Sequence, residues 1–137
     1  MKTIWLIGGM SWESSIEYYR IINETAKEKL GGLHSAKSLM VTVDFAEIEK
    51  LQHADRWDET GQILVKSAQD LERGGADFIV LCTNTMHKLA DQIIANVNIP
   101  FLHIADATAE KLLQRGLNAS ACLARALRWS MIFIKVG

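Results

Sequence analysis

The chain has 137 residues, of which 49% are hydrophobic and 23% charged, a composition typical of one globular domain with a single apolar core. Its net charge is −1 and it has no basic run, which argues against nucleic acid or an anionic membrane as a partner. Cys82 and Cys122 are too few for a disulfide framework, and the four histidines are not spaced with them as zinc ligands, so we expect no metal.

The N-terminal residues predict a buried strand and then a helix. Residues 3–7, TIWLI, form an apolar strand that runs into Gly8 and Gly9, and Ser11 can cap the following helix. The apolar segment is too short for a signal peptide or a membrane span, so we expect a cytoplasmic, reduced protein. Apolar residues three and four positions apart predict the helix face that packs on the core: Ile16, Tyr19, Ile22, Ala26 and Leu30.

Three more strands and three more helices alternate along the chain. Residues 44–56 are expected to be a polar connection. The predicted strands are 39–43, 77–81 and 100–104, and the predicted helices begin near Trp57, Met86 and Asp106 and end near Gly74, Val97 and Arg115.

This βαβαβαβα order predicts an α/β fold with a three-layer open sheet. The strands are apolar throughout, which indicates a parallel sheet covered by helices on both faces. With the order 2-1-3-4, the loops GGMSWES and CTNTMH lie side by side at the carboxyl edge, where open α/β sheets bind ligands. Each loop opens a helix, which favours a carboxylate or a phosphate. The glycine spacing fits neither a dinucleotide fingerprint nor a P-loop, and the glycines could simply permit a tight turn.

The loop after the third strand carries the candidate chemistry. Cys82 is expected to have a lowered pKa because a helix N-terminus favours the thiolate, and Asn84 and Thr85 can bind a substrate carboxylate. The alternative is a capping residue beside a buried structural cysteine. Gln52, which follows the second strand, could reach the same rim or be a plain surface residue. His87 could contact the ligand or lie at the edge of the core.

Five segments together resemble the aspartate/glutamate racemase family, the cofactor-independent amino-acid racemases. They span residues 1–117 in matching order and read IGGMSWESSIEYYRIIN, LGGLHSA, VDFAEIE, FIVLCTNTMHK and PFLHIADAT. The resemblance implies the N-terminal half of a pseudo-symmetric two-domain isomerase, with one acid/base residue from each half on either side of the substrate α-carbon. One residue removes the α-proton as a thiolate and the other returns a proton from the opposite face, without pyridoxal phosphate or metal.

The chain departs from the family at one position. Family members commonly read C-N-T where this chain reads T-N-T, so Thr83 stands at the acid/base position and Cys82 lies one residue earlier. Adjacent strand residues point in opposite directions, so Cys82 is expected to face the core and Thr83 the ligand. Both remain catalytic candidates. A threonine hydroxyl is a weak acid, which predicts unequal handling of the two enantiomers or reliance on water or on the other half's cysteine. The resemblance adds substrate-binding candidates: Met10, Ser11, Trp12, Asn84 and Thr85.

The resemblance stops after Leu117, and we expect residues 118–137 to be an aberrant tail. They can be read as an apolar, basic helix, but a back-translation shifted by one base gives a glycine-ended strand and a helix start. We hypothesise a one-base frameshift near Asn118 that replaces the second half, and on this view Cys122 is not the second catalytic cysteine.

The sequence therefore predicts a racemase domain at residues 1–117, which acts on a small acidic amino acid and is incomplete in this form. The face meant for the other half is exposed, so a homodimer is one expected outcome. One alternative is a catalytically silent domain that binds an amino acid or a carboxylate. Another is a flavodoxin-like phosphate-binding domain, which the missing phosphate motifs disfavour.

Overall fold

The computed structural model describes residues 1–116, so the expected tail and Cys122 lie outside the described residues. The chain divides into two compact units, Met1–Phe101 and a second unit that begins at Leu102. Within residues 1–116 no helix is both long enough and apolar enough to cross a membrane.

A four-stranded sheet contains strands β1 (Ile4–Gly8), β2 (Ser38–Thr42), β3 (Phe78–Leu81) and β4 (Phe101–Leu102). Their order is β2-β1-β3-β4, which confirms the order predicted from the sequence. β1 runs parallel to both neighbours, and its residue Ile7 lies opposite Val41 of β2 and Leu81 of β3. The two longest apolar runs therefore occupy the centre of the sheet.

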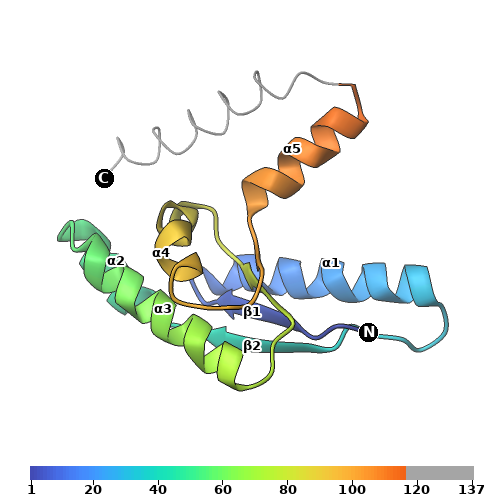
Figure 1. The fold of residues 1–137 in the computed structure, drawn as a ribbon, viewed down its shortest axis with the longest axis horizontal. Coiled ribbons are helices and arrows are strands. Elements are labelled where there is room, and N and C mark those ends of the chain that lie inside the picture. Colours follow the sequence, from blue (N-terminus) through green and yellow to red (C-terminus); the bar gives the residue numbers. More distant parts are fainter. Residues whose placement is uncertain (117–137) are drawn as a thin grey trace. The chain divides into compact units, whose positions relative to one another are not determined.

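Helices cover both faces of this sheet, as Figure 1 shows for α1 and α3 on either side of β1 and β2. Helix α1 covers one face, where its residues Tyr18 and Ile22 pack against Leu6 and Val80. On the other face, helix α3 and the segment after β3 pack against Ile7 and other strand residues. The helices are α1 (Trp12–Leu30), α2 (Phe45–His53), α3 (Trp57–Arg73), the 3-10 helix η1 (Thr85–Leu89), α4 (Ala90–Ile94) and α5 (Ile104–Gln114).

Two elements in the second half of the described chain differ from the sequence prediction. The helix expected to run from Met86 to Val97 is instead η1 followed by the short α4, although its predicted apolar residues Met86, Leu89 and Ile93 are buried. The fourth strand has two residues rather than five, because His103 already caps α5 by accepting a hydrogen bond from the Ala105 amide at 3.1 Å.

The segment predicted to be a polar connection contains helix α2. Its first residues form a capping arrangement, in which the Asp44 side chain accepts a hydrogen bond from the Ala46 amide at 3.1 Å and Glu47 adds a negative charge to the first turn. Ile48 is fully buried and anchors the helix to the core. In the sequence, the start of this helix is therefore marked by Asp44, by Glu47 three positions later and by the apolar Ile48 that follows.

The apolar stripe predicted for the core side of α1 is only partly buried. Ile16, Tyr19 and Leu30 expose 52%, 51% and 53% of their surface, which contradicts the prediction. The face that packs on the sheet contains Ser15, which is buried, together with the half-buried Tyr18 and its neighbours Ile22 and Ala26. The face of α1 that contacts the sheet is therefore rotated about the helix axis relative to the face that the apolar spacing predicts.

Candidate functional site

The candidate site lies where β1 and β3 end side by side. Ile7 and Leu81 are paired in register, and the Cys82 amide donates a hydrogen bond to the Ile7 carbonyl at 2.8 Å. The loop that follows Gly8 and the loop that follows Leu81 therefore leave the same edge of the sheet as direct neighbours. This is the crevice position at which open α/β sheets bind ligands.

The first loop is built around two glycines that have no room for a side chain. Gly9 has a φ of +96°, and a Cβ there would meet the backbone of Val43, with the Val43 nitrogen at 2.9 Å. A Cβ on Gly8 would meet the Ser15 hydroxyl, which accepts a hydrogen bond from the Gly9 amide at 3.0 Å. The glycines thus serve backbone packing, the structural alternative raised for them.

The residues after these glycines differ in how far they are exposed. Met10 is 4% exposed and packs in the core, so its side chain supports the loop from below. Ser11 occupies the N-cap position of α1, but its side chain makes no capping hydrogen bond, contrary to the prediction. Trp12 begins the helix and is 61% exposed. Ser11 and Trp12 are therefore the two positions of this loop that a ligand can contact through side chains.

Cys82 is buried completely and does not have the lowered pKa that its position predicts. It packs with Leu6 and Val80 against the α1 side of the sheet. Burial raises the pKa of the Cys82 thiol to about 12, because desolvation disfavours the thiolate. Burial also raises the pKa of the neighbouring Tyr18 phenol, with a smaller contribution from Cys82. At neutral pH Cys82 is a neutral thiol within an apolar cluster.

Thr83 follows immediately and is 8% exposed. Its carbonyl accepts a hydrogen bond from His87 Nδ1 at 2.7 Å, one helical turn further on. The His87 ring also makes an edge-on contact with Phe101, with ring centroids 5.8 Å apart. His87 therefore anchors the loop that carries Thr83, a role that the sequence prediction did not assign to it.

Asn84 and Thr85 are both exposed at the start of η1. Asn84 occupies the N-cap position without making a side-chain capping bond, so the capping alternative does not account for it. Among the described residues, this loop combines a nearly buried hydroxyl, an exposed amide and a second exposed hydroxyl within three positions. Such groups can hydrogen-bond a carboxylate and an ammonium without carrying a net charge of their own.

No described contact links Gln52 to the other residues of the candidate site. It lies in the last turn of α2, eight residues after the helix cap, which corresponds to about 12 Å along the helix axis.

Ser15 is the supporting residue that sequence reasoning missed. Its signal was a small polar residue at the first core-facing position of α1, directly after the glycine turn.

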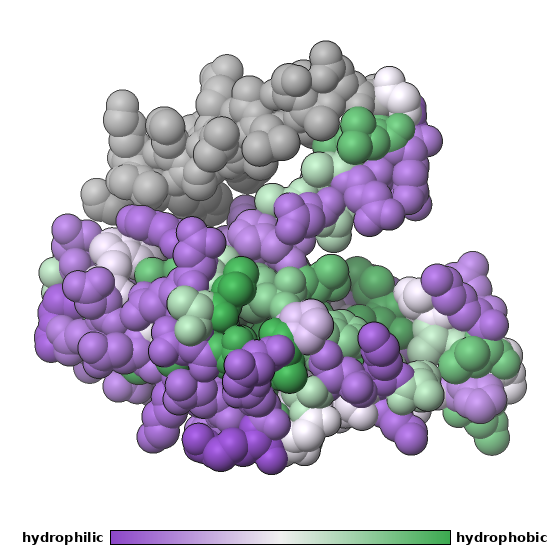
Figure 2. Space-filling model, viewed as in Figure 1, coloured by the Kyte–Doolittle hydropathy of each residue, from purple (hydrophilic) through white to green (hydrophobic). Residues whose placement is uncertain are grey.

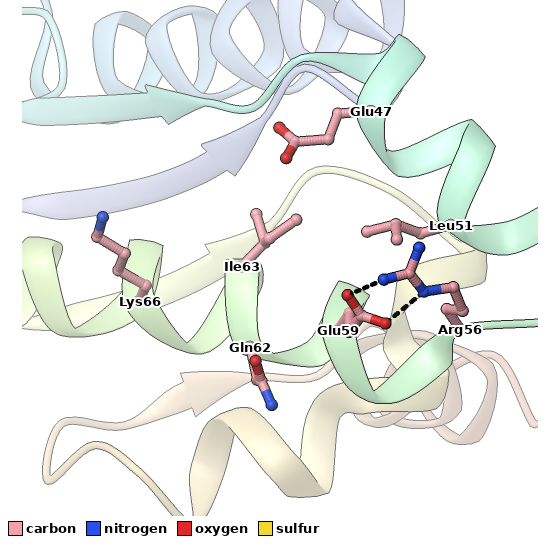
Figure 3. A pocket seen from close by; sticks show the side chains of 7 residues that line it. All are labelled: Glu47, Leu51, Arg56, Glu59, Gln62, Ile63 and Lys66. Atoms are coloured by element: carbon pink, nitrogen blue, oxygen red, sulfur yellow. Dashed lines mark hydrogen bonds and ion pairs between the residues drawn. The ribbon is translucent and has the colours of Figure 1, made fainter.

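A separate surface pocket of about 480 Å³ lies between α2 and α3. Figure 3 shows an ion pair between Arg56 and Glu59 on one side of it and Glu47 across from them. None of the candidate site residues lines this pocket. Its charged groups are solvent-exposed, and Arg56 is already paired with Glu59, so the pocket has little to hold a ligand in place. The residues that line it are Glu47, Leu51, Arg56, Glu59, Gln62, Ile63 and Lys66.

Comparison with known proteins defines the class of protein. The family model for Asp/Glu/hydantoin racemases matches residues 7–130. The chain therefore belongs to the Asp/Glu/hydantoin racemase family. The match runs past Leu117, where the sequence resemblance was expected to end. Among curated proteins, the broad specificity amino-acid racemase RacX of Bacillus subtilis is 35% identical over 63 residues, which is 44% of this chain and 28% of RacX.

Several solved structures resemble this chain and are longer than it. A Yersinia pestis protein assigned to the Asp/Glu racemases is 56% identical with a TM-score of 0.82, covering 85% of this chain and 50% of its own. An aspartate racemase homologue from Pyrococcus horikoshii is 35% identical with a TM-score of 0.78 over the same shares. Picrophilus torridus aspartate racemase, at 17% identity and a TM-score of 0.69, shares the fold. The chain thus spans about half the length of these solved proteins.

Proposed function

We propose that this chain is the N-terminal half of an amino-acid racemase and binds an aspartate- or glutamate-type amino acid at the loops after β1 and β3. The observation that carries the proposal is the adjacency of these loops, fixed by the pairing of Ile7 with Leu81. In this proposal, Asn84 and Thr85 hydrogen-bond the substrate, and Ser11 and Trp12 close the opposite side. The acidic class of substrate follows from the racemases that the chain resembles.

The proposed reaction is the inversion of the α-carbon by two-base proton transfer without a cofactor. A base on one face takes the α-proton, the C–H electron pair passes to Cα and its carboxylate, and an acid on the other face supplies a new proton. Thr83 occupies the position of one of these groups. Its hydroxyl ionises too weakly to take the proton as an alkoxide at neutral pH, so we propose that it relays a proton through water or donates a hydrogen bond. Cys82 supports this assignment of roles, because its neutral thiol is packed in the core.

A second candidate function is favoured by the same burial of Cys82. With the thiol held neutral and only hydroxyls and an amide at the site, the described half could bind an amino acid without exchanging its α-proton. It would then be a silent amino-acid-binding domain. The two candidates agree on the position of the ligand and differ on the chemistry.

The test combines binding and proton exchange. The 137-residue chain is titrated with L- and D-aspartate and glutamate by calorimetry, and the loss of the α-proton signal in heavy water is followed by NMR. We expect binding of at least one acidic amino acid, and exchange that is faster for one enantiomer than for the other. Binding without exchange would establish the silent domain, whereas the absence of both would overturn the proposed function.

Two variants assign the effect to the site. Thr83→Val removes the hydroxyl at nearly constant volume, and we expect it to lower the exchange rate at least about tenfold, a loss of about 1.4 kcal/mol of transition-state stabilisation. Thr108→Val is the matched control, because Thr108 lies on α5 and its hydroxyl donates only to the Ile104 carbonyl within its own helix. Equal rates for the two variants would remove Thr83 from the mechanism.

A further inference from the structure

His87 makes two hydrogen bonds to the loop after β3, and together they fix two successive peptide groups. Its Nδ1 atom lies 2.7 Å from the Thr83 carbonyl oxygen, and its backbone amide donates to the Asn84 carbonyl at 3.1 Å. A carbonyl oxygen can only accept, so the acceptor assigns the proton to Nδ1 and makes it the donor. One residue therefore holds both the peptide that follows Thr83 and the peptide that follows Asn84.

The imidazole ring of His87 is itself held by the sheet. Its contact with the Phe101 ring of β4 has centroids 5.8 Å apart and an interplanar angle of 71°. Phe101 packs against the core cluster, and the carbonyl of the preceding Pro100 accepts a hydrogen bond from the Ile79 amide of β3 at 2.8 Å. The sheet therefore fixes the position of the Thr83 carbonyl through Phe101 and His87.

The backbone of His87 is fixed because the short helix η1 is held from its inner side. Met86 and Leu89 are 2% and 8% exposed and belong to the core cluster. Lys88 places its ammonium nitrogen 4.1 Å from the centroid of the Trp57 ring on α3, a cation–π contact between the two helices. The outer surface over α3 is largely hydrophilic in Figure 2, as expected for a helix that turns its apolar residues toward the core.

Because His87 fixes the loop, the polar side chains of the loop do not have to. Asn84 occupies the N-cap position of η1 but makes no capping hydrogen bond with its side chain. The Asn84 amide and the Thr85 hydroxyl are exposed at the loop surface. The loop is therefore held from the core side, through its carbonyl groups, and keeps these side chains available to a ligand.

We propose that His87 is a positioning residue of the racemase site, whose Nδ1–H bond to the Thr83 carbonyl holds Thr83 and Asn84 in the geometry that proton transfer at the substrate α-carbon requires. This inference rests on the proposed function. It gives His87 neither a contact with the substrate nor a proton to transfer. A displacement of about 1 Å in a reacting group can slow a reaction about a hundredfold, so a rotated peptide after Thr83 slows proton transfer even where the ligand still binds.

Two substitutions separate the hydrogen bond of His87 from its packing. His87→Asn keeps an amide donor close to the position of Nδ1 and removes the ring, whereas His87→Phe keeps a ring against Phe101 and removes the donor. If His87 serves packing alone, the asparagine variant is the more impaired of the two. If His87 positions Thr83 through its hydrogen bond, the phenylalanine variant is the more impaired, and asparagine rescues the reaction.

The wild-type 137-residue chain and the variants are compared by α-proton exchange in heavy water at saturating aspartate or glutamate, by calorimetric affinity and by urea denaturation. We expect His87→Phe to lower the exchange rate at least about tenfold with a smaller change in affinity, and His87→Asn to remain within about threefold of the wild-type rate. His53→Phe is the control, because the His53 side chain is 70% exposed on α2. Exchange rates that follow the order of stability, or a His87→Phe variant as fast as the wild-type chain, would overturn the positioning role.

NMR tests the hydrogen bond without any activity. Long-range proton–nitrogen spectra distinguish the two imidazole nitrogens, and we expect a protonated Nδ1 for His87. His103 is an internal reference of the opposite kind, since its Nδ1 accepts from the Ala105 amide at 3.1 Å. An unprotonated Nδ1 on His87 would overturn this inference and leave the proposed function standing. A wild-type chain with the protonated Nδ1 but no α-proton exchange would overturn the positioning role together with the racemase function.

Discussion

Two adjacent residues, Cys82 and Thr83, illustrate how the environment of a side chain decides its chemistry. Their positions after β3 follow from the sequence, because the apolar run and the following polar residues predict a strand end. The sequence also suggested a reactive thiol, since helix N-termini lower the pKa of cysteine. The structure places Cys82 in an apolar cluster, where desolvation outweighs any such effect and raises the pKa to about 12. That balance depends on packing partners such as Leu6, which no local pattern reveals.

The raised pKa predicts an unreactive thiol. At pH 8 we expect iodoacetamide to alkylate Cys82 in the folded chain at least about a hundredfold more slowly than in the urea-unfolded chain, because the thiolate is the reacting form. Folding favours the protonated thiol, so this protection persists as the pH rises through the ordinary range of a cysteine and fails only near pH 12.

Peptide mapping by mass spectrometry measures this protection and separates Cys82 from Cys122. Rapid alkylation of Cys82 at pH 8 in the folded chain would contradict its placement in the core and return it to the list of catalytic groups.

At the scale of elements, apolar periodicity identified α1 but only part of its buried face. Of the predicted stripe, Ile22 and Ala26 are half-buried on the sheet side, whereas Ile16, Tyr19 and Leu30 are exposed, and the buried Ser15 was not predicted to face the sheet. Ser15 is selected by a tight approach to the glycine turn, which needs a small hydrogen-bonding side chain. Spacing alone cannot weigh that requirement against hydrophobicity.

Helix α2 was missed because its sequence is mostly polar, and its start depends on Asp44. We expect Asp44→Ala to lower the free energy of unfolding by about 1 kcal/mol, since the Ala46 amide loses its capping acceptor. Asp44→Asn keeps an acceptor at the same position and should cost less. Urea denaturation of the three proteins measures the difference. An alanine variant as stable as the wild-type chain would show that α2 does not need this cap.

For the molecule as a whole, strand order was predictable because four apolar runs separated by helices permit few arrangements. The pairing of β1 with β3 then follows, and with it the neighbouring loops of the candidate site. The length of β4 and the position of Gln52 were not predictable. The strand β4 ends at Leu102 because His103 already caps helix α5. Gln52 lies where it does because it belongs to helix α2, which the sequence analysis did not predict.

The sheet order also predicts unequal protection of two amides that donate to β1. The Cys82 amide bonds to the Ile7 carbonyl at 2.8 Å from the centre of the sheet, and the Val43 amide bonds to the Gly8 carbonyl at 3.1 Å from the end of the edge strand. We expect the Cys82 amide to exchange with solvent at least about tenfold more slowly, because opening it requires separating the central strands. Hydrogen exchange followed by NMR measures both, and equal rates would indicate that the edge and the centre open together.

The glycine turn after β1 bears on how this scaffold can be diversified. Gly8 and Gly9 leave no space for a Cβ, and Met10 is enclosed by the core, so three successive positions cannot accept variation without rebuilding the turn. Under the proposed function, new ligand preferences would arise from Ser11 and Trp12 or from the loop after β3. A combinatorial library confined to those positions would vary the proposed contact residues while keeping the scaffold intact.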